Sequence, residues 1–428
     1  MTDRTPELEP SIIVIFGITG DLSQRYLLPA LYHLIKDGLL HEKTEIVGIS
    51  RRDVPVAEVL QNLSQKESDA LEIMQGKTRM HKMDVTKQED YAELRAKLNA
   101  IEEEKGVCMN RLYYLSIPPQ VYGPIIKLMG AEGLSASCQH DNAMTRLLVE
   151  KPFGYDLHSA QELIEETGKV FTEEQIFRID HYLAKETVQQ ILNFRIDNPD
   201  FESLWNREHL AGIDISASEA IGIEGRADFY EPLGALRDFI QSHLMQLLAV
   251  VTMERPDSMD SEHIHATKQA LLKQVKTIGA DKVMIETVRG QYEGYRDEVN
   301  NPDSITETFA AVRLRIDSGR WRDVPIILWT GKALAEKKTE ITPRFTDTEV
   351  AKHLPDLQSF DDQTHPTPYE RVIVEAVRGD HTLFATSTEV LESWRVLQPV
   401  ISEWSKNGDG LIIYKKGTPG SELIAPLQ

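Results

Sequence analysis

The first half of the chain alternates between short apolar runs and longer segments with helical periodicity. The predicted strands cover residues 11–17, 45–50, 79–85, 111–116, 146–150 and 175–179, and the first of them, SIIVIFG, is fully apolar. Helical patterns fill the intervals, at 56–74, at 88–103, up to about 130, and at 156–170. Fully apolar runs of this length are typical of parallel strands buried on both faces. The alternation therefore predicts an N-terminal α/β domain built on a doubly wound parallel sheet.

Several of these predicted strands end in residues that can bind ligands. Gly17, Arg51, Ser116, Lys151 and Asp180 each lie at such an end. In doubly wound sheets, ligands bind outside the carboxyl ends of the strands. This shared position favours a binding role for each residue more strongly than its local spacing does.

The first strand runs directly into a turn with two glycines, Gly17 and Gly20, three positions apart. A strand, a glycine turn and an amphipathic helix together let backbone N–H groups approach a pyrophosphate at the helix N-terminus. The pattern is not the full GxGxxG, and a tight turn without any ligand is an alternative. The second strand ends in Ser50-Arg51-Arg52, where an arginine would accommodate a 2′-phosphate. This favours NADP over NAD, although two solvated arginines are an equally good interpretation until the fold is known.

The segment 178–186, RIDHYLAKE, gathers an acid, an imidazole, a phenol and an ammonium. If a helix begins near His181, then His181 and Lys185 share a face and offer two cationic donors to a phosphate dianion. Asp180 would then point elsewhere and pair with a distant group. From spacing alone, a polar helix N-terminus with Asp180 as cap and Lys185 in solvent is the more common arrangement.

The second half has a different periodicity. Residues 210–217 and 309–317 alternate between apolar and polar, most clearly in their second halves, which predicts antiparallel strands with one wet face. A further strand at 324–328 precedes Lys332, with Lys337 just beyond. An α+β domain with a large, mainly antiparallel sheet is therefore expected.

A long helix is predicted between these strands, at 234–251, and His243 falls on its apolar stripe. The plain interpretation is a core histidine that bonds a neighbour. The alternative is a general base whose pKa a half-buried carboxylate holds near the working pH. Asp238 on this helix and Glu219 at a strand end are acids that either serve the same site or are surface charge.

Composition excludes several classes of function. The net charge of −21 argues against a nucleic-acid or anionic-membrane binder, though a local cationic pocket can still hold an anionic substrate. No apolar run approaches a membrane span, and the N-terminus does not read as a signal peptide. The two cysteines, Cys108 and Cys138, favour a reducing cytoplasm without a structural disulfide. His263 and His265 have no third ligand type nearby, so no metal site is expected.

With these motifs in order, the chain resembles the glucose-6-phosphate dehydrogenase family nearly end to end. The resemblance rests on FGITGDLSQR, YLSIPPQVY, LLVEKPFG, RIDHYLAKE, ALRDFIQSHLMQ, ETFAAVRLRID, VPIILWTGK and YERVIVEAVRGD. The combination of RIDHYLAKE, EKPFG and the histidine helix is specific, unlike the glycine turn alone. It implies a Rossmann-type NADP-binding domain at 1–180 and a substrate-binding and oligomerisation domain at 181–428.

The activity that the resemblance implies is oxidation of the C1 hydroxyl of β-glucose 6-phosphate to 6-phosphoglucono-lactone, with hydride transfer to NADP⁺. This is the first step of the oxidative pentose phosphate pathway. The reaction needs a base for the hydroxyl proton, a hydride acceptor nearby and a grip on the phosphate. His243 matches the family's base, and Asp180 matches the acid that orients and stabilises that imidazole.

The remaining roles are carried over in the same way. The family's phosphate clamp corresponds to His181, Tyr182, Lys185 and Lys337 of this sequence. The family's contacts to the sugar hydroxyls correspond to Glu219, Asp238 and Lys332. Lys151, ahead of a proline, matches the lysine that touches both sugar and nicotinamide. Coenzyme contacts match Gly17, Ile18, Thr19, Gly20, Asp21, Leu22, Ser23, Arg51 and Tyr122.

The chain also departs from the family pattern. Ala184 stands where a glycine is usual, and Tyr26 replaces a usual lysine beside the coenzyme, which leaves NAD possible as well as NADP. Between Arg344 and Tyr369 the chain is much shorter than the family's typical segment. We therefore expect no second, structural NADP site, while a cytoplasmic homodimer remains the expected assembly.

Two other interpretations compete with this one. A sugar dehydrogenase of the Gfo/Idh/MocA type also joins a Rossmann domain to an open sheet and carries an EKP lysine, but RIDHYLAKE and the His243 helix speak against it. A non-catalytic sensor of NADP or sugar phosphates would suit the shortened C-terminal region. It is disfavoured because the acid, imidazole and ammonium groups are retained together.

Overall fold

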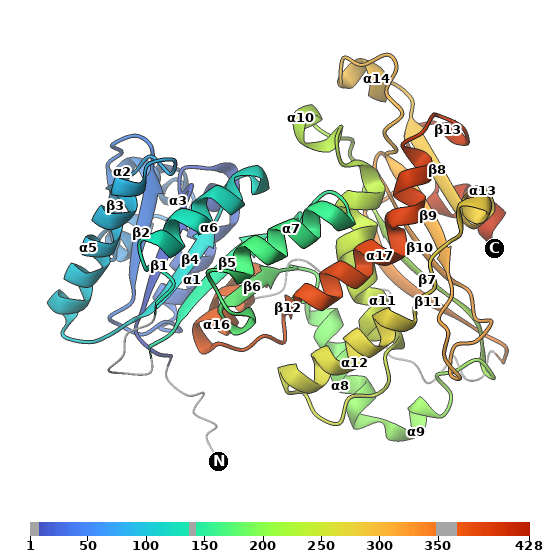
Figure 1. Cartoon of the computed structure of the whole chain (residues 1–428), viewed down its shortest axis with the longest axis horizontal. Coiled ribbons are helices and arrows are strands. Elements are labelled where there is room, and N and C mark those ends of the chain that lie inside the picture. The colour runs from blue at the N-terminus through green and yellow to red at the C-terminus, as the bar shows by residue number, and fades with distance from the viewer. Residues whose placement is uncertain (1–7, 137–142, 348–365) are drawn as a thin grey trace. The chain divides into compact units, whose positions relative to one another are not determined.

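The computed structural model describes residues 8–136, 143–347 and 366–428. These residues form two compact units (Figure 1). Unit 1 comprises the described residues of Met1–Phe153, Gln161–Ala184 and Gln363–Thr386. Unit 2 comprises those of Gly154–Ala160, Lys185–Asp362 and Ser387–Gln428. The functional division at 1–180 and 181–428 stays a prediction.

Unit 1 is built on a seven-stranded sheet with the order β12-β6-β5-β4-β1-β2-β3. The strands are β1 Ser11–Phe16, β2 Glu45–Ser50, β3 Thr78–Lys82, β4 Asn110–Leu115, β5 Thr145–Glu150, β6 Ile176–Ile179 and β12 Phe384–Ala385. All neighbours pair in parallel except β12, which pairs antiparallel with β6. Without β12, this is the strand order of a dinucleotide-binding fold. The predicted Rossmann-type doubly wound sheet is thus confirmed.

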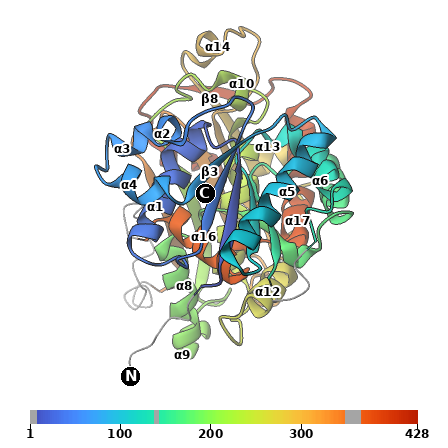
Figure 2. The same ribbon diagram turned by 90° about the vertical axis from the view of Figure 1, so that its left-hand side faces the viewer.

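Helices cover both faces of this sheet, which is why β1 and β2 are buried along their whole length. Figure 2 shows α1 and α4 on one side of the strands and α5 and α6 on the other. The helical segments that lie in unit 1 are η1 Ser23–Leu27, α1 Leu28–Lys36, α2 Val56–Val59, α3 Gln61–Ser64, α4 Ala70–Gln75, α5 Gln88–Lys105, η2 Pro119–Val121, α6 Tyr122–Ala131, η3 Glu173–Gln175 and α16 Pro368–Arg378. Helix α7, Leu157–Gly168, begins in unit 2 and ends in unit 1.

One predicted helix of unit 1 is wrong. Residues 56–74 form the three short helices α2, α3 and α4 instead of one long helix. The break before α4 has a tertiary cause, because Asp69 is held by helix α1. Its carboxylate accepts a hydrogen bond from Tyr32 and lies 2.9 Å from the ammonium of Lys36. Helical periodicity in the sequence contains no information about that contact.

Unit 2 is built on a six-stranded sheet with the order β11-β7-β10-β9-β8-β13. Its strands are β7 Leu210–Ser218, β8 Thr287–Tyr292, β9 Phe309–Leu314, β10 Ile326–Gly331, β11 Lys338–Phe345 and β13 Leu411–Tyr414. The β7–β10 and β8–β13 pairs are parallel and the other three pairs are antiparallel. The predicted α+β domain with a mainly antiparallel sheet is confirmed. The predicted shortening between 344 and 369 falls mostly outside the described residues.

Helices and a second apolar cluster enclose the sheet of unit 2. The helical segments are α8 Glu186–Asp197, α9 Pro199–Glu202, α10 Ala227–Tyr230, η4 Leu236–Leu244, α11 Met245–Thr252, α12 Ser261–Gln274, η5 Ala280–Lys282, α13 Val283–Glu286, α14 Tyr295–Glu298, α17 Ser387–Trp404, α18 Gly420–Leu423 and η6 Ala425–Leu427. All eight residues of α11 are buried, so this helix lies at the centre of the unit. Phe309, Ala311 and Ile327 form part of a separate buried cluster with Tyr292 and Tyr414.

The single helix predicted at 234–251 consists of two helices of different geometry. Residues Leu236–Leu244 form a π-helix, η4, and the α-helix α11 continues from Met245. Hydrogen bonds in a π-helix join residues five apart, so each turn is wider than in an α-helix. Asp238 and His243, both candidate site residues, lie on η4 and are five positions apart.

Three further expectations concerned disulfides, metal sites and membrane-spanning segments. Cys108 is disulfide-bonded, so the expected absence of a structural disulfide is wrong. Sequence spacing does not show which cysteines meet in space, and the chain's other cysteine, Cys138, lies outside the described residues. Within the described ranges no cluster of three or more metal-binding side chains occurs. No helix in those ranges is both long and apolar enough to cross a membrane.

A buried charge network joins α12 to α17 in unit 2. The Glu389 side chain is inaccessible to solvent, and its two oxygens lie 2.8 Å from His265 Nδ1 and 2.9 Å from Lys268 Nζ. Burial acts to raise the pKa of Glu389, but the charges and hydrogen bonds of Lys268 and His265 outweigh it and lower the pKa to about 2. The carboxylate therefore stays charged and compensates a lysine that is itself buried.

Replacing this carboxylate should destabilise unit 2 strongly. Glu389→Ala leaves the Lys268 ammonium buried without its counter-charge, which typically costs about 3–5 kcal/mol. Urea denaturation of variant and wild type measures the difference. The control is Glu403→Ala on the same helix, whose pair with Lys406 is exposed and should contribute less than about 1 kcal/mol. Equal effects of the two substitutions would contradict a structural role for the buried network.

Candidate active site

The turn after β1 is closed around a glycine that no other residue can replace. Gly17 has a φ of +82°, and a Cβ there would lie 2.4 Å from the carbonyl oxygen of Ser116. Ser23 fastens the turn, because its Oγ lies 3.0 Å from Gly17 O, to which it can donate, and 2.9 Å from the hydroxyl oxygen of Ser116. Ile18 is buried while Thr19 is exposed. The inner side of the turn is therefore filled by the backbone that follows β4. The opposite side, where Thr19 is exposed, is open to a ligand, as a dinucleotide site requires.

The arginines after β2 lie where a ribose phosphate would be read in such a fold. Arg51 and Arg52 are both exposed. No hydrogen bond or ion pair among the described residues occupies either guanidinium. The glycine turn and these two cations fit a coenzyme that carries a 2′-phosphate.

Tyr122 is buried, and its hydroxyl is engaged by the backbone. It donates to Leu115 O at 3.1 Å, and it lies 3.3 Å from both the N and the O of Glu150. The phenol thus joins the carboxyl ends of β4 and β5. Predicted as a coenzyme contact, Tyr122 in this structure positions the strand ends from which Ser116 and Lys151 follow.

Glu150, the last residue of β5, is a further candidate site residue that no sequence pattern had singled out. Its Oε1 accepts a hydrogen bond of 2.6 Å from the hydroxyl of Tyr114. It pairs in register with Ile179, so Asp180 follows on the neighbouring strand. Burial, with a smaller contribution from the charge of Asp180, raises the pKa of Glu150 to about 7, against the lowering effects of Tyr114 and Lys151. The EKP motif drew attention to its lysine, and only the sheet register brings the two acids together.

His181 and Lys185 would share a helix face only if a helix began near His181, and this condition is not met. Residues 181–184 form a turn, and α8 begins at Glu186 with Lys185, in an extended conformation, as its N-cap residue. Asp180 keeps the helix from starting earlier, because its Oδ1 accepts a hydrogen bond from Tyr182 N at 3.0 Å and its carbonyl oxygen accepts one from Leu183 N at 3.0 Å. Such local side-chain bonds compete with helix formation. His181 and Lys185 therefore do not share a helix face, while Asp180 and Lys185 are both buried.

A stack of rings in unit 1 involves the residue that replaces the expected lysine. The ring of Tyr26 stacks on Tyr369 at 5.0 Å between centroids, and Tyr369 faces the ring of His181 at 6.4 Å. Burial, followed by the charge of Glu150, raises the pKa of Tyr369 well above its usual range. An aromatic surface that is about half exposed at Tyr26 thus stands where the family pattern has a cation.

Two predicted sugar contacts of unit 2 form an ion pair. Glu219 follows β7 and Lys332 follows β10, and these strands run parallel, with Gly331 paired to Ser218. The Lys332 ammonium bonds the Glu219 carboxylate, and the lysine side chain is almost inaccessible. The pairing is fixed by backbone bonds from Glu219 N to Gly331 O and from Lys332 N to Thr308 O, each 2.9 Å.

Tyr230, at the end of α10, is a second residue that the sequence analysis missed. The Lys332 ammonium lies 5.2 Å from its ring centroid. The side chain is 2% exposed, and its hydroxyl has no hydrogen-bond partner among the described residues. Burial, with the nearby charges of Asp238 and Glu307, raises the pKa of Tyr230 far above its usual value. A cluster of acids therefore surrounds this phenol.

The π-helix that carries Asp238 and His243 is held at its start by a buried acid. Glu307 Oε1 accepts from Leu236 N at 3.0 Å. A Cβ on Gly234, whose φ is +67°, would lie 2.4 Å from that carboxylate, so glycine is required there. His243 is 1% exposed, and its ring meets Phe239 edge-on at 4.9 Å. The imidazole is thus fixed in a dry environment, and Asp238 is half-buried on the same helix.

The predicted residues fall into two groups. In unit 1, the glycine turn, Arg51, Lys151 and Asp180 lie at the carboxyl ends of parallel strands. In unit 2, Glu219 and Lys332 form an ion pair. Tyr230 lies next to the Lys332 ammonium and is close enough to Asp238 for the charge of that acid to raise its pKa. Lys337 is exposed, five residues beyond Lys332.

The shifted acid Glu150 predicts a pH effect on stability. A carboxyl whose pKa is raised in the folded protein penalises folding once it must ionise, so the folded state should lose stability as the pH rises from about 4.5 to about 7. Glu150→Gln removes this penalty, so the variant should gain stability relative to wild type across that window. Urea denaturation at several pH values measures the difference. Exposed Glu165→Gln should show no such trend, and the same flat profile for Glu150→Gln would refute the assignment.

Two family models together match nearly the whole chain. The model for the glucose-6-phosphate dehydrogenase NAD binding domain matches residues 14–190. The model for the glucose-6-phosphate dehydrogenase C-terminal domain matches residues 192–357 and 350–427. The N-terminal part is therefore an NAD(P)-binding domain.

Curated relatives match over nearly their full length. The glucose-6-phosphate 1-dehydrogenase of Chlamydia muridarum is 35% identical over 473 residues, which cover 95% of this chain and 92% of the relative. That of Bacillus subtilis is 34% identical over 474 residues, which cover 97% of this chain and 96% of the relative. Both aligned lengths exceed the 428 residues of this chain, so these relatives contain residues without a counterpart here.

Solved structures agree with these matches. A glucose-6-phosphate dehydrogenase in complex with its substrate glucose-6-phosphate has a TM-score of 0.84 and 28% identity, with 99% of both chains covered. The myo-inositol 2-dehydrogenase of Lactobacillus plantarum, with 93% of this chain and 98% of that chain covered, reaches a TM-score of 0.53 at 12% identity, which shows the fold alone. The matches of both family models and of full-length relatives show that the chain belongs to the glucose-6-phosphate dehydrogenase family.

Proposed function

We propose that this protein is a glucose-6-phosphate 1-dehydrogenase. It oxidises D-glucose 6-phosphate at C1 to 6-phospho-D-glucono-1,5-lactone, with NADP⁺ as the hydride acceptor, and so begins the oxidative pentose phosphate pathway. The observation that carries the proposal is the Glu219–Lys332 ion pair at parallel strand ends, in the same unit as the π-helix with Asp238 and His243. Family membership supports it, as does the similar solved structure of a glucose-6-phosphate dehydrogenase in complex with its substrate glucose-6-phosphate.

In this proposal His243 is the general base. The C1 hydroxyl loses its proton to the imidazole as the C1 hydrogen leaves as hydride, so the carbon is oxidised by two electrons and one proton stays on the protein. When bound, NADP⁺ supplies the acceptor for that hydride. Burial of His243 supports the role, because a fixed imidazole in a dry environment loses little orientation on binding substrate. Asp180 keeps its predicted role as the acid that orients the imidazole and stabilises it once protonated.

The sugar and its phosphate are assigned to separate groups of residues. Glu219, Asp238 and Lys332 bind sugar hydroxyls, where a paired acid and base offer both an acceptor and a donor. Lys185, His181, Tyr182 and Lys337 bind the phosphoryl group. Lys185 is a buried cation at the N-terminus of the twelve-residue helix α8, where the helix dipole also favours an anion.

The coenzyme is assigned to the carboxyl ends of the strands in unit 1. The glycine turn would hold the pyrophosphate, and Arg51 would bind the 2′-phosphate, so NADP is preferred over NAD. Lys151, beside Glu150, would contact both sugar and nicotinamide. Tyr26 adds no cation on the phosphate side, so measurable use of NAD is expected as well. We further propose a cytoplasmic homodimer, as the family resemblance implies.

A comparison of sugar substrates and coenzymes tests the proposal. The protein is mixed with glucose 6-phosphate or with glucose, and with NADP⁺ or NAD⁺, while the absorbance of the reduced nicotinamide is followed. Turnover that requires the phosphate group is the expected result. Turnover of unphosphorylated sugars alone would favour a Gfo/Idh/MocA-type dehydrogenase, and NADP binding without any turnover would favour a sensor.

His243→Asn should lower kcat by about 10²–10⁴-fold while KM changes little, because a general base acts in the transition state. Asp180→Asn should also lower kcat, and the double variant should lose much less than the product of the two single effects. The matched control is His263→Asn on α12, a half-exposed histidine that should leave both constants unchanged. Near-wild-type kcat in the His243 variant would remove this residue from the mechanism.

Lys185→Ala should mainly raise KM for glucose 6-phosphate, by about 10-fold or more, because a charge-assisted hydrogen bond to phosphate serves binding. KM for NADP⁺ should stay within about twofold, since the proposed contact is to the sugar phosphate. Steady-state kinetics of the variant measure both constants, with exposed Lys273→Ala as control. An unchanged KM for glucose 6-phosphate would place the phosphate at other residues.

A further inference from the structure

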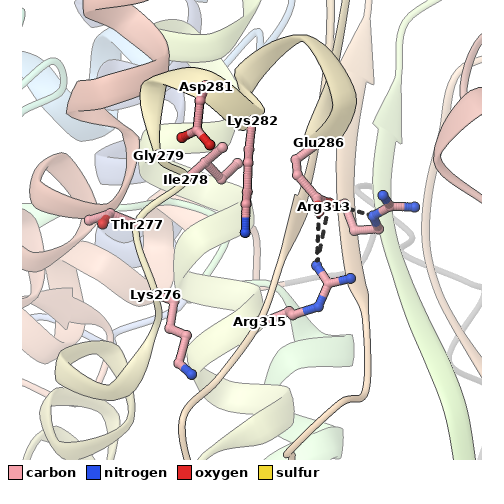
Figure 3. A pocket seen from close by; sticks show the side chains of 9 residues that line it. All are labelled: Lys276, Thr277, Ile278, Gly279, Asp281, Lys282, Glu286, Arg313 and Arg315. Carbon is pink, nitrogen blue, oxygen red and sulfur yellow. Dashed lines mark hydrogen bonds and ion pairs between the residues drawn. The ribbon is translucent and has the colours of Figure 1, made fainter.

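A cavity of about 570 Å³ lies in unit 2, lined by none of the residues assigned above (Figure 3). One wall is the loop 276–279 with Asp281 and Lys282. The other wall is formed by Glu286 of α13, Arg313 of β9 and Arg315 just beyond the end of that strand. The volume falls within the range of small-molecule sites in proteins.

The walls of this cavity are fastened to each other by backbone bonds. Lys276 N donates to Arg315 O at 2.9 Å, and Asp317 N donates to Gln274 O at 2.8 Å. Lys282 N donates to Gly279 O at 2.8 Å, which closes a turn in the loop. The cationic side chains therefore project from a preformed frame instead of a loose segment.

The acid on the strand side is already neutralised. Glu286 lies 2.5 Å from Arg313 Nε and 3.3 Å from Arg315 Nη1. Burial acts to raise the pKa of Glu286, but the hydrogen bond from Arg313 and the charge of Arg315 hold it below its usual value. Arg313 is anchored further, since its Nη1 donates to Leu427 O at 2.9 Å. Two arginines thus share one carboxylate, and the strand side keeps an excess of positive charge.

Three cationic groups remain available to a ligand. Arg315 is 43% exposed and uses only one edge of its guanidinium on Glu286. Lys282 is exposed and makes no ion pair with any described residue. Lys276 pairs with Asp317 at 3.1 Å, but both side chains are more than half exposed, so this pair is weak. Asp281 is the remaining acid of the lining.

The cavity lies at the opposite end of the sheet from the proposed sugar contacts. Lys332 bonds Thr308, immediately before β9, whereas Arg315 follows the last residue of that strand. At the rise of an extended strand, this separation along β9 is roughly 20 Å. A molecule bound between Lys282 and Arg315 would therefore not reach Lys332.

We propose that this cavity binds a small anion with two or more linked phosphoryl groups. One phosphoryl group would lie against the strand side, where the free edge of Arg315 offers paired donors, and the next against Lys276 and Lys282. The chain carries a net charge of −21, so the overall field repels anions, and attraction comes only from this local excess of cations. The proposal does not depend on the assigned dehydrogenase activity.

Isothermal titration of the full-length protein with inorganic tripolyphosphate tests this site. Saturable binding of one molecule per chain, weakened by added salt, is the expected result. The double variant Lys276→Gln/Lys282→Gln should weaken it at least tenfold, and Arg315→Gln should do so independently. The control pair is Lys273→Gln and Lys406→Gln, two exposed lysines of the same unit outside the cavity, which should leave binding unchanged.

Further arms separate this site from the proposed substrate and coenzyme sites. Excess glucose 6-phosphate together with NADP⁺ should not displace tripolyphosphate, and Lys185→Ala should bind it as wild type does. ATP binding with the same dependence on Lys282 would extend the site to nucleoside triphosphates. Absence of saturable binding, displacement by substrate, or equal affinity in the cavity variants would each overturn the proposal.

Discussion

The parallel pairing of β7 with β10 is the constraint on which the proposed sugar site depends. Most neighbours in this sheet run antiparallel, and an antiparallel partner would place the ends of two strands at opposite edges. Because these two run parallel, Glu219 and Lys332 leave the sheet side by side and form an ion pair. A lysine buried this deeply needs a counter-charge, so the pair is required by the fold as well as useful for binding polyhydroxy compounds.

Parallel strand pairing also places the candidate residues of unit 1. Its six parallel strands present their carboxyl ends at one edge, and this collects Gly17, Ser116, Lys151 and Asp180 from distant parts of the chain. The polar groups there support each other. Ser23 fastens the glycine turn to β4, Tyr122 joins β4 to β5, and Tyr114 holds the carboxyl of Glu150. Ligand-binding residues are thus placed by a rigid sheet, which limits what they lose in ordering when a ligand binds.

Much of the candidate site could be predicted because its residues directly follow strands with a strong apolar pattern. Such runs fix where a strand ends, and a parallel sheet then fixes which ends meet. Expectations failed where side-chain contacts, local or tertiary, compete with helical periodicity. Asp180 accepts hydrogen bonds from Tyr182 N and Leu183 N, so His181 and Lys185 do not share a helix face. Asp69 is held by α1, and the helix predicted at 56–74 is broken before α4. Tyr230 and Glu150 were missed because a tyrosine and a glutamate with no special spacing carry no signal until their neighbours in space are known.

The sequence by itself determined the family, the two kinds of sheet, and most residues of the proposed site, because these depend on local patterns and on motifs that stay contiguous in the chain. Only the tertiary structure decided the geometry of the helix that carries Asp238 and His243. An α-helix has 3.6 residues per turn and a π-helix has a wider turn. Over the nine residues of η4 the two periods are too similar for the spacing of apolar residues to distinguish them. The raised pKa of Glu150 and the cation-lined cavity beside Arg315 were likewise decided by packing. Both depend on which charges the fold brings within a few ångströms of each other, and on how much water it removes from between them.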